Sequence, residues 1–402
     1  MKINKFYNIY FFSLIFFGSS FLYLKHYGGL DSSISDWLIN YSGGFVRRGF
    51  SGQIAIYLSN FLNIELRKSI LILQLLVFIS FNILVYNYFK NISFNRIIFL
   101  AVFCPLFVLY PVAETEALGR KELIIFIIVI TYFFTDIKKK SNQFFFKTII
   151  FPLAILIWEP IVFFFSYIFL IEILSQSQSL SKEKFIKLIL SYIFVFLTFL
   201  YVYLNPITEL NFLIMKNFLS SNFNEICYLS CKFVGNQSQN TFYELMVFNI
   251  SHVKISYIIR YLLIILIGFY PLFFLIKNSQ FEETNKPNFK FFNKIKIHYL
   301  FSLAFIPSLI LYLIMYDWGR IVHVSYTFVL LSFFHLIRTK KVIINSEKVK
   351  RSIINKISRK TFIIFAIIFC LGWHPKVVIS EDVASKPVYT IPYKFYKYFI
   401  KN

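Results

Sequence analysis

Long runs of apolar residues alternate with short polar segments along the whole chain. Runs dominated by Phe, Ile and Leu recur from residue 6 to residue 373. Each run is solidly apolar, whereas a strand of a membrane barrel alternates apolar and polar positions, so the pattern predicts helices. Since a helix needs about 20 residues to cross the hydrocarbon core, the chain has room for about eleven such helices. The predicted fold class is an all-α polytopic transmembrane bundle.

The composition supports a membrane protein. Hydrophobic residues make up 58% of the chain and aromatic residues 21%, and the mean hydropathy is +0.66. A soluble domain usually has about 45–50% apolar residues. We find no internal repeat and no soluble segment of domain size, so residues 1–402 are expected to form one transmembrane domain.

The formal net charge of +23 raises the question of nucleic-acid binding, because basic clusters neutralise phosphates. The basic residues, however, lie in short blocks at every second loop, as the positive-inside rule requires of cytoplasmic loops. The sequence therefore predicts no nucleic-acid partner and places these basic loops on the cytoplasmic side of a membrane. The blocks are Lys2 and Lys5, Lys138 to Lys140, Lys182 to Lys187, Lys286 to Lys296, and Arg338 to Lys360.

The N-terminus is predicted to be cytoplasmic, because lysines precede the first apolar run. Gly18-Ser19-Ser20 also resembles a signal-peptide cleavage region, but the apolar run continues to Leu24, which favours an uncleaved helix over about 6–24. Residues 25–68 then form the first extracytoplasmic loop, in which the moderately apolar stretch 50–66 is expected to be an interfacial helix.

Two later tracts need interpretation. Residues 97–136 split into two helices at the polar decapeptide 113–122. Phe144 to Leu174 is either one long helix or a hairpin broken at Trp158-Glu159-Pro160, and the hairpin is favoured because a single crossing would move every later lysine-rich loop outside. Residues 205–256 become the largest extracytoplasmic loop. The odd helix count leaves the C-terminal tail outside, although the aromatic, lysine-bearing residues 389–400 also suit a membrane interface. The other helices are expected near 69–89, 187–204, 257–277, 299–316, 325–337 and 361–373.

The cysteines do not form a metal-binding pattern. Cys104 and Cys370 lie in apolar runs and are expected to be buried. Cys227 and Cys231 lie in a loop predicted to be outside, where disulfides persist, and are a candidate disulfide that the spacing alone leaves open. The sequence has no phosphate-binding P-loop, dinucleotide fingerprint or metalloprotease motif, so we expect neither a metal nor a cofactor.

The segment from Asp36 to Gly52 concentrates charge and glycine as no other part of the chain does. Arg47 and Arg48 are candidate ligands of a lipid-linked phosphate, since the planar guanidinium matches phosphate oxygens. The alternative is that both arginines extend to lipid headgroups. Glycine lets the backbone approach a ligand or present its amides. The glycines of this segment are Gly43, Gly44, Gly49 and Gly52.

Asp36 is the first candidate for a general base that accepts a proton from an acceptor hydroxyl. Asp31 is a neighbouring competitor. A helix cap or a permanent ion pair with arginine is the alternative role for Asp36. Glu116 is the second candidate base, although its spacing to Arg120 also fits an ion pair along one helix face. Arg120 is a candidate phosphate ligand.

A third segment, Asp317-Trp318-Gly319-Arg320, repeats the order of acid, tryptophan, glycine and base seen in the first. Arg320 is a further candidate phosphate ligand. His323 is expected either to act in acid–base chemistry or to donate to a backbone carbonyl. Glu114 and Glu159 are secondary carboxylate candidates, with helix capping as the alternative for Glu159.

These charged groups fall at helix ends that the topology places outside. Because an ionisable group near the bilayer centre costs at least about 2.5–3.5 kcal/mol on insertion scales, they are expected to share an outward-facing polar cavity.

Three stretches, Tyr41-Ser-Gly-Gly-Phe-Val-Arg-Arg-Gly, Glu116-x-x-Gly-Arg-Lys-Glu122 and Asp317-Trp-Gly-Arg320, together with the topology, carry a resemblance. The chain resembles multi-pass proteins of bacterial surface-polysaccharide assembly, the O-antigen-polymerase-like and C-type glycosyltransferase-like group. The resemblance implies a polyprenyl-phosphate or pyrophosphate sugar donor on the outer face of the inner membrane. It assigns the base to Asp36 and the lipid pyrophosphate to Arg47, Arg48 and Arg320. The chain has no large soluble outer domain and no Asp-x-Asp pair, which counts against a metal-dependent mechanism.

The leading hypothesis is a glycosyltransferase or glycan polymerase for O-antigen-like polysaccharide, as in lipopolysaccharide synthesis, with an undecaprenyl-phosphate-type donor. Its expected partners are the polyprenyl-linked glycan, membrane lipid and other polysaccharide-assembly proteins. The main alternative is a transporter or flippase for a lipid-linked sugar or another anion, although such proteins often show inverted repeats and charges near the membrane midplane. The third hypothesis is a non-catalytic membrane scaffold.

Overall fold

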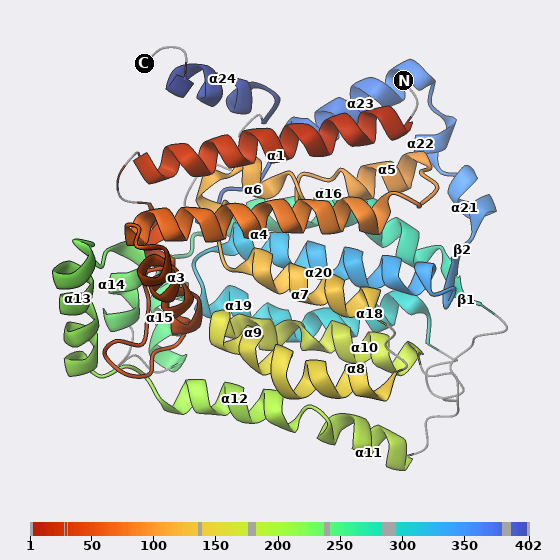
Figure 1. Cartoon of the computed structure of the whole chain (residues 1–402). Coiled ribbons are helices and arrows are strands. Elements are labelled where there is room, and N and C mark those ends of the chain that lie inside the picture. The colour runs from red at the N-terminus through yellow and green to blue at the C-terminus, as the bar shows by residue number, and fades with distance from the viewer. Residues whose placement is uncertain are drawn as a thin grey trace.

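The computed structural model describes residues 3–27, 29, 31–135, 139–175, 182–236, 242–282, 295–379 and 387–399. These residues form an all-α bundle (Figure 1), which confirms the predicted fold class. Among them, six helices are long and apolar enough to cross a membrane. They cover Lys5–Tyr27, Leu66–Phe89, Glu183–Leu204, Ile255–Lys277, Ile297–Ile314 and Trp318–Arg338.

The first half of the chain contains a mixture of long and short helices. Its α-helices are α1 (Ile3–Tyr27), α2 (Ser32–Asp36), α3 (Gly49–Leu62), α4 (Leu66–Phe89), α5 (Arg96–Val102), α6 (Tyr110–Ala113), α7 (Glu122–Phe134), α8 (Lys140–Phe145), α9 (Phe151–Ile157), α10 (Phe165–Ser175), α11 (Lys182–Leu190) and α12 (Ile193–Leu204). Shorter turns are the 3-10 helices η1 (Thr115–Ala117) and η3 (Glu159–Phe164) and the π-helical turn η2 (Phe146–Ile150).

The second half contains further helices and one small antiparallel ribbon. Its helices are α13 (Glu209–Phe223), α14 (Leu229–Asn236), α15 (Phe242–His252), α16 (Ile255–Lys277), α18 (Ile297–Phe305), η5 (Ile306–Ser308), α19 (Leu309–Ile314), α20 (Trp318–Arg338), α21 (Ser346–Lys350), α22 (Ile353–Lys356), α23 (Arg359–Leu371) and α24 (Pro387–Phe399). Strand β1 (Ser279–Phe281) pairs with β2 (Val342–Ile344), with Gln280 opposite Ile343.

Helix α20 is the centre of the bundle. In its most apolar stretch 94% of the residues are buried inside the protein, compared with 17% for the stretch that covers α11 and α12. Helices α7, α10 and α16 pack around α20, as Figure 1 shows. A helix with protein on all sides can hold polar residues that would be costly against lipid.

The bundle has two different ends (Figure 1). Helices α3, α13, α14 and α15 lie together at one end, which we call the α3 end, and β1, β2, α21 and α22 lie at the other, which we call the β end. The β end carries the basic block that follows α20, including Lys340, Lys348 and Lys350. The positive-inside rule therefore predicts that the β end faces the cytoplasm.

The apolar tract before the decapeptide is not one continuous helix, and in this respect the sequence prediction was wrong. Helix α5 ends at Val102, and α6 begins only at Tyr110. Pro105 lies in the irregular stretch between them. Proline lacks an amide donor and disfavours helical backbone at the preceding residue, which explains the interruption.

The tract from Phe144 to Leu174 breaks where the sequence predicted a hairpin. Helix α9 ends at Ile157, and Trp158 is extended, with φ −155° and ψ 95°. Pro160 follows at the start of η3, and in Figure 1 helix α10 returns to the side where α8 begins. The break places Glu159 at the α3 end of the bundle.

Candidate functional site

The first polar segment, Asp36 to Gly52, leads into the start of α3 and is held by close backbone packing. Arg48 has a left-handed backbone, with φ 64°, and Gly44 has φ 104°. A Cβ on Gly43 would lie 1.9 Å from the carbonyl oxygen of Asn211 in α13, and one on Gly52 would lie 2.0 Å from that of Ile39. The glycines at 43 and 52 therefore allow close packing between chain segments. Their predicted role in the approach of a ligand stays a prediction.

Asp36 ends α2 and is buried. Its Oδ1 lies 3.6 Å from Nζ of Lys121, whose side chain is fully buried. Burial raises the pKa of the Asp36 carboxyl, but Lys121 and then Arg48 lower it more, and the net pKa is below its ordinary value. Asp36 thus forms a buried ion pair, as in the predicted alternative, but with a lysine and not with an arginine. Its general-base role stays a prediction.

Lys121 joins the first segment to the second. Its Nζ donates to the carbonyl oxygen of Arg48 at 2.7 Å, in addition to its ion pair with Asp36. Burial lowers the pKa of Lys121 to about 8, although Asp36 opposes this shift. The sequence predicts no separate role for Lys121, because nothing in the decapeptide indicates which of its charged side chains faces inward.

The Trp158–Pro160 break contributes the partner of Arg48. Nε and Nη2 of Arg48 donate to the two carboxylate oxygens of Glu159, each at 2.7 Å. This two-point geometry is the strong form of an arginine–carboxylate pair. Glu159 therefore does not serve as a helix cap through its side chain, and it neutralises an arginine that the sequence assigned to phosphate. Arg47, next in the chain, is half-buried.

The second segment is not the helix that the spacing of Glu116 and Arg120 suggested. The turn η1 ends at Ala117, Leu118 is extended, and Gly119 has φ 79°. Trp37 Nε1 and Gln74 Nε2 both donate to the Gly119 carbonyl oxygen, at 2.8 and 3.0 Å. The left-handed glycine thus lets the first segment and α4 lock the second in place.

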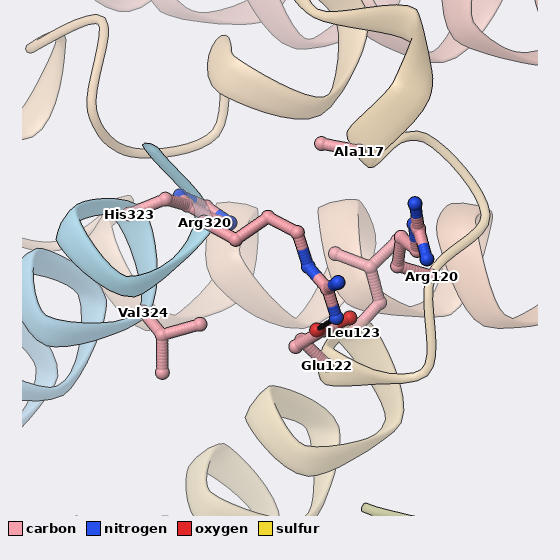
Figure 2. Close-up of a pocket in the computed structure, with 7 residues that line it drawn as sticks. All are labelled: Ala117, Arg120, Glu122, Leu123, Arg320, His323 and Val324. Carbon is pink, nitrogen blue, oxygen red and sulfur yellow. Dashed lines mark hydrogen bonds and ion pairs between the residues drawn. The ribbon is translucent and has the colours of Figure 1, made fainter. Parts of the chain in front are cut away.

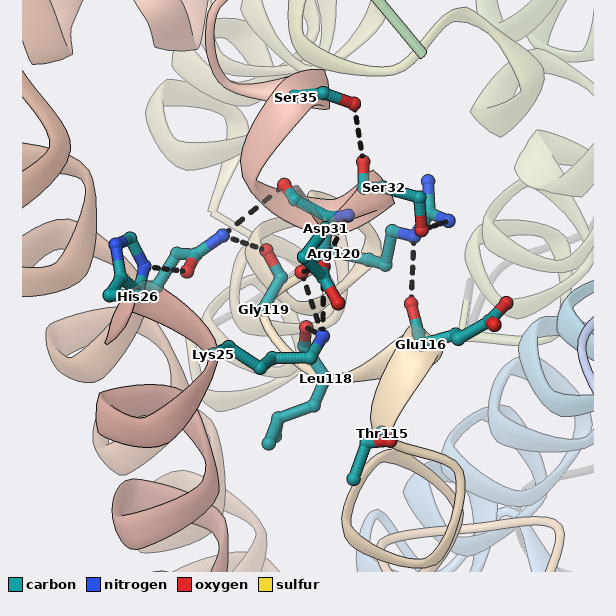
Figure 3. A network of polar contacts seen from close by, with 12 residues as sticks. Lys25, His26, Asp31, Ser32, Ser35, Thr115, Glu116, Leu118, Gly119 and Arg120 are labelled. Atoms are coloured by element: carbon teal, nitrogen blue, oxygen red, sulfur yellow. Dashed lines mark hydrogen bonds and ion pairs between the residues drawn. The ribbon is translucent and has the colours of Figure 1, made fainter. Parts of the chain in front are cut away.

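Arg120 is held by neutral oxygen atoms (Figure 3). Its Nε donates to the backbone carbonyl of Glu116 at 2.9 Å, and its Nη2 donates to Oγ of Ser32 at 2.8 Å. Within the described residues it forms no ion pair with a carboxylate. Arg120 is also buried, with only 7% of its surface exposed. A buried guanidinium with neutral partners keeps its attraction for an anion.

The third segment begins α20 and enters the same region. Arg320 and His323 lie inside α20, because this helix starts at Trp318 and not near residue 325 as predicted. Arg320 pairs with two carboxylates, through Nη1 with Asp317 and through Nη2 with Glu122. Nδ1 of His323 contacts the Leu106 carbonyl oxygen at 2.8 Å, which is the structural alternative given for this histidine.

A small cavity lies where the second and third segments meet (Figure 2). Its volume of about 10 Å³ is the space of a single water molecule. This conformation is therefore closed to anything as large as a phosphate-bearing headgroup. The residues that line the cavity are Ala117, Arg120, Glu122, Leu123, Arg320, His323 and Val324.

Glu114 belongs to a separate buried group. Its Oε2 lies 3.4 Å from Nε2 of His374 and 3.2 Å from Nζ of Lys376. Burial raises the pKa of Glu114, but His374 and Lys376 lower it below its ordinary value. The backbone beyond these residues supports α20, since the amide of Gly319 donates to the Val377 carbonyl oxygen at 3.1 Å. The sequence predicts no role for the segment that contains His374 and Lys376, because it follows the last apolar run.

Cys227 and Cys231 form a disulfide beside the first segment. Helix α14, which contains Cys231, packs on α2. The backbone amide of Ser230 donates to Oγ of Ser35 at 3.1 Å. The disulfide loop thus supports α2, which carries Asp36 and the Ser32 partner of Arg120.

The structure thus brings together Asp36, Arg48, Arg120, Glu159, Asp317, Arg320 and His323 at the α3 end, while Glu114 lies in its own group and Glu116 contributes a backbone oxygen. Within the described ranges no group of three or more His, Cys, Asp or Glu residues is placed to hold a metal ion. Comparison with known proteins finds no matching family model, curated protein or solved structure.

Proposed function

We propose that this membrane protein binds a polyprenyl-phosphate-linked sugar donor at the α3 end and transfers the glycan to an acceptor hydroxyl. The observation that carries the proposal is the pairing of an uncompensated guanidinium with a carboxylate in one cavity. Arg120 and Glu122 both line that cavity, and Arg320 closes it from α20. To catalyse such a transfer, the protein must bind the anionic phosphate and accept a proton from the acceptor hydroxyl.

The charges around the cavity explain why Arg120 suits the phosphate. Arg320 is already paired with the carboxylates of Asp317 and Glu122. Arg120 has no direct carboxylate partner among the described residues. An incoming phosphate can therefore pair with Arg120 without breaking an existing ion pair. Arg48, which the sequence also predicted as a phosphate ligand, is less suitable than Arg120, because Arg48 is already paired with Glu159.

The side of the membrane follows from charge. The cavity lies toward the end of the bundle away from the lysine-rich β end, which the positive-inside rule assigns to the cytoplasm. The donor would thus be used on the outer leaflet, as in surface-polysaccharide assembly. Because the cavity is closed in this conformation, donor binding requires Arg120 and its neighbours to separate.

Binding of undecaprenyl phosphate to the purified protein in lipid nanodiscs tests the first half of the proposal. We expect the phosphate to raise the thermal unfolding temperature and undecaprenol, which lacks the phosphate, to leave it unchanged. Arg120→Ala should weaken binding at least about tenfold, consistent with loss of a charge-assisted contact. Arg96→Ala is the matched control, because Arg96 is also held by carbonyl oxygens, those of Ile354 and Ile357, but at the β end.

The second half is tested in a strain of the source organism that lacks the gene. A transferase predicts loss of long-chain glycan and accumulation of the lipid-linked donor on the outer leaflet. Accumulation on the inner leaflet would instead identify a flippase. The proposed function would be refuted if wild-type protein did not bind undecaprenyl phosphate and the strain without the gene made unchanged glycan.

A further inference from the structure

Glu122 is the carboxylate best placed to take a proton in the cavity, although the sequence gave it no separate role. It begins α7, lines the cavity and is 4% exposed. Its Oε1 accepts from Nη2 of Arg320, whereas Oε2 is buried and has no hydrogen-bond partner among the described residues. Figure 2 shows its carboxylate beside the Arg320 guanidinium. A buried carboxylate oxygen usually has a donor. Oδ1 of Asp36, Oε2 of Glu114 and Oε2 of Glu172 also have none among the described residues, but of these four residues only Glu122 lines the cavity.

The other carboxylates of the region are engaged differently. Both oxygens of Glu159 accept from Arg48, and Asp36 is held by the buried ammonium of Lys121. Asp317 has a side chain that is 28% exposed, and water competes there. None of these three lines the cavity. Glu122 alone among them combines a position in the cavity wall with a vacant oxygen.

We propose that Glu122 is the general base of the glycosyl transfer, an inference that rests on the proposed function. The acceptor hydroxyl oxygen attacks the anomeric carbon of the donor, and a new carbon–oxygen bond forms. The bond from that carbon to the phosphate oxygen breaks, and the departing polyprenyl phosphate keeps the electron pair. Oε2 of Glu122 receives the hydroxyl proton. Arg320 orients the carboxylate through Oε1, and Arg120 lies in the same wall to stabilise the leaving phosphate.

The two arginines that line the cavity, Arg320 and Arg120, have different partners. Arg320 is tied to the base by its ion pair, so it fixes the direction of Oε2. Arg120 is tied only to Ser32 and to the Glu116 carbonyl, so its charge remains for the phosphate. Two arginines in one cavity therefore have different tasks, one as a positioning residue and one as a ligand.

Glu122→Gln tests the assignment, because the amide keeps the size of the side chain and an oxygen that accepts from Arg320 but cannot take the proton. We expect this variant to bind undecaprenyl phosphate within about threefold of wild type and to make glycan at least about 100-fold more slowly, the usual contribution of a general base. Glycan synthesis above a tenth of the wild-type level would overturn the inference.

Glu172→Gln is the matched control for loss of a buried carboxylate. Glu172 is fully buried and pairs with Lys147 at 2.6 Å, away from the cavity. We expect the folded fraction of this variant to keep its glycan synthesis. If Glu172→Gln lost activity as completely as Glu122→Gln, loss of any buried ion pair would explain both, and the assignment would fail.

Glu122→Ala provides a second test that does not depend on the glutamine variant folding well. Removal of the side chain leaves room for formate, a small carboxylate that can replace the missing base. We expect 100 mM-scale formate, on the order of a weak ligand's dissociation constant, to raise glycan synthesis at least about fivefold in membranes that contain Glu122→Ala, and not in membranes with Arg120→Ala. Absence of rescue in protein that still binds undecaprenyl phosphate would contradict the inference while leaving the proposed function intact.

Discussion

The ion pair between Arg48 and Glu159 is predicted to stabilise the α3 end strongly, and a double-mutant cycle measures it. The variants are Arg48→Met, Glu159→Gln and the two together. The pair joins segments 111 positions apart in the chain through two hydrogen bonds of 2.7 Å. Each single substitution leaves one charge of the pair without its partner, whereas the double variant removes both charges.

The magnitude follows from the exposure of the two side chains, 21% for Arg48 and 15% for Glu159. Breaking a fully buried pair costs about 3–5 kcal/mol, and a fully exposed pair contributes about 0.2–1 kcal/mol. Because both side chains are mostly buried, we expect each single variant to lose about 2–4 kcal/mol of the free energy of unfolding. The coupling energy should be about 2 kcal/mol.

Unfolding of the purified protein in mixed micelles with increasing dodecyl sulfate, followed by tryptophan fluorescence, gives these free energies. A second cycle on Glu65 and Lys68 is the control, because that pair lies on the surface with its side chains 70% and 63% exposed. Its coupling should stay below about 0.5 kcal/mol. A coupling of the same size for Arg48 and Glu159 would refute the reasoning that burial makes this pair strong.

Three further predictions concern the same region. Gly319→Ala places a methyl group 1.8 Å from the Lys376 carbonyl oxygen, so the melting temperature should fall; an unchanged value would contradict the packing. Burial lowers the pKa of Lys121 to about 8 from 10.5, so the folded protein releases this proton where the unfolded chain still holds it. Relative to Lys121→Met, wild type should therefore gain up to about 1.4 kcal/mol of unfolding free energy per pH unit between these values, and a flat difference in micelle titrations would exclude this. Replacing Cys227 and Cys231 by serine should cost about 2 kcal/mol by loop entropy, and dithiothreitol should destabilise only the wild type.

The sequence was sufficient to predict the class of fold and several breaks in it. Solid apolar runs predicted helices, and Trp158-Glu159-Pro160 was recognised as an interruption because proline and a charge both disfavour a continuous span. The interruption at Pro105 was missed, since an isolated proline between apolar residues leaves the hydropathy pattern unchanged. Periodicity reports burial, and it does not report where the backbone bends.

The candidate site was predicted less completely. The sequence named Arg48, Arg120 and Arg320, and the structure brings all three to one end of the bundle. It could not show that Arg48 is neutralised by Glu159, because a pairing over that separation depends on tertiary contacts alone. For the same reason the sequence could not show which roles Lys121 and Glu122 have, since they are adjacent in a stretch of four polar or small residues, 119–122.

The burial of α20 has a consequence for how the protein is made. Lone insertion of a span that contains Arg320, His323 and His335 would expose these side chains to hydrocarbon at a cost of several kcal/mol. Helices α7, α10 and α16 precede α20 in the chain, so they leave the ribosome first and can form a slot that receives it. Glu122, at the start of α7, would then meet Arg320 as the late helix docks, and the cavity that both residues line would be completed only when most of the polypeptide has been synthesised.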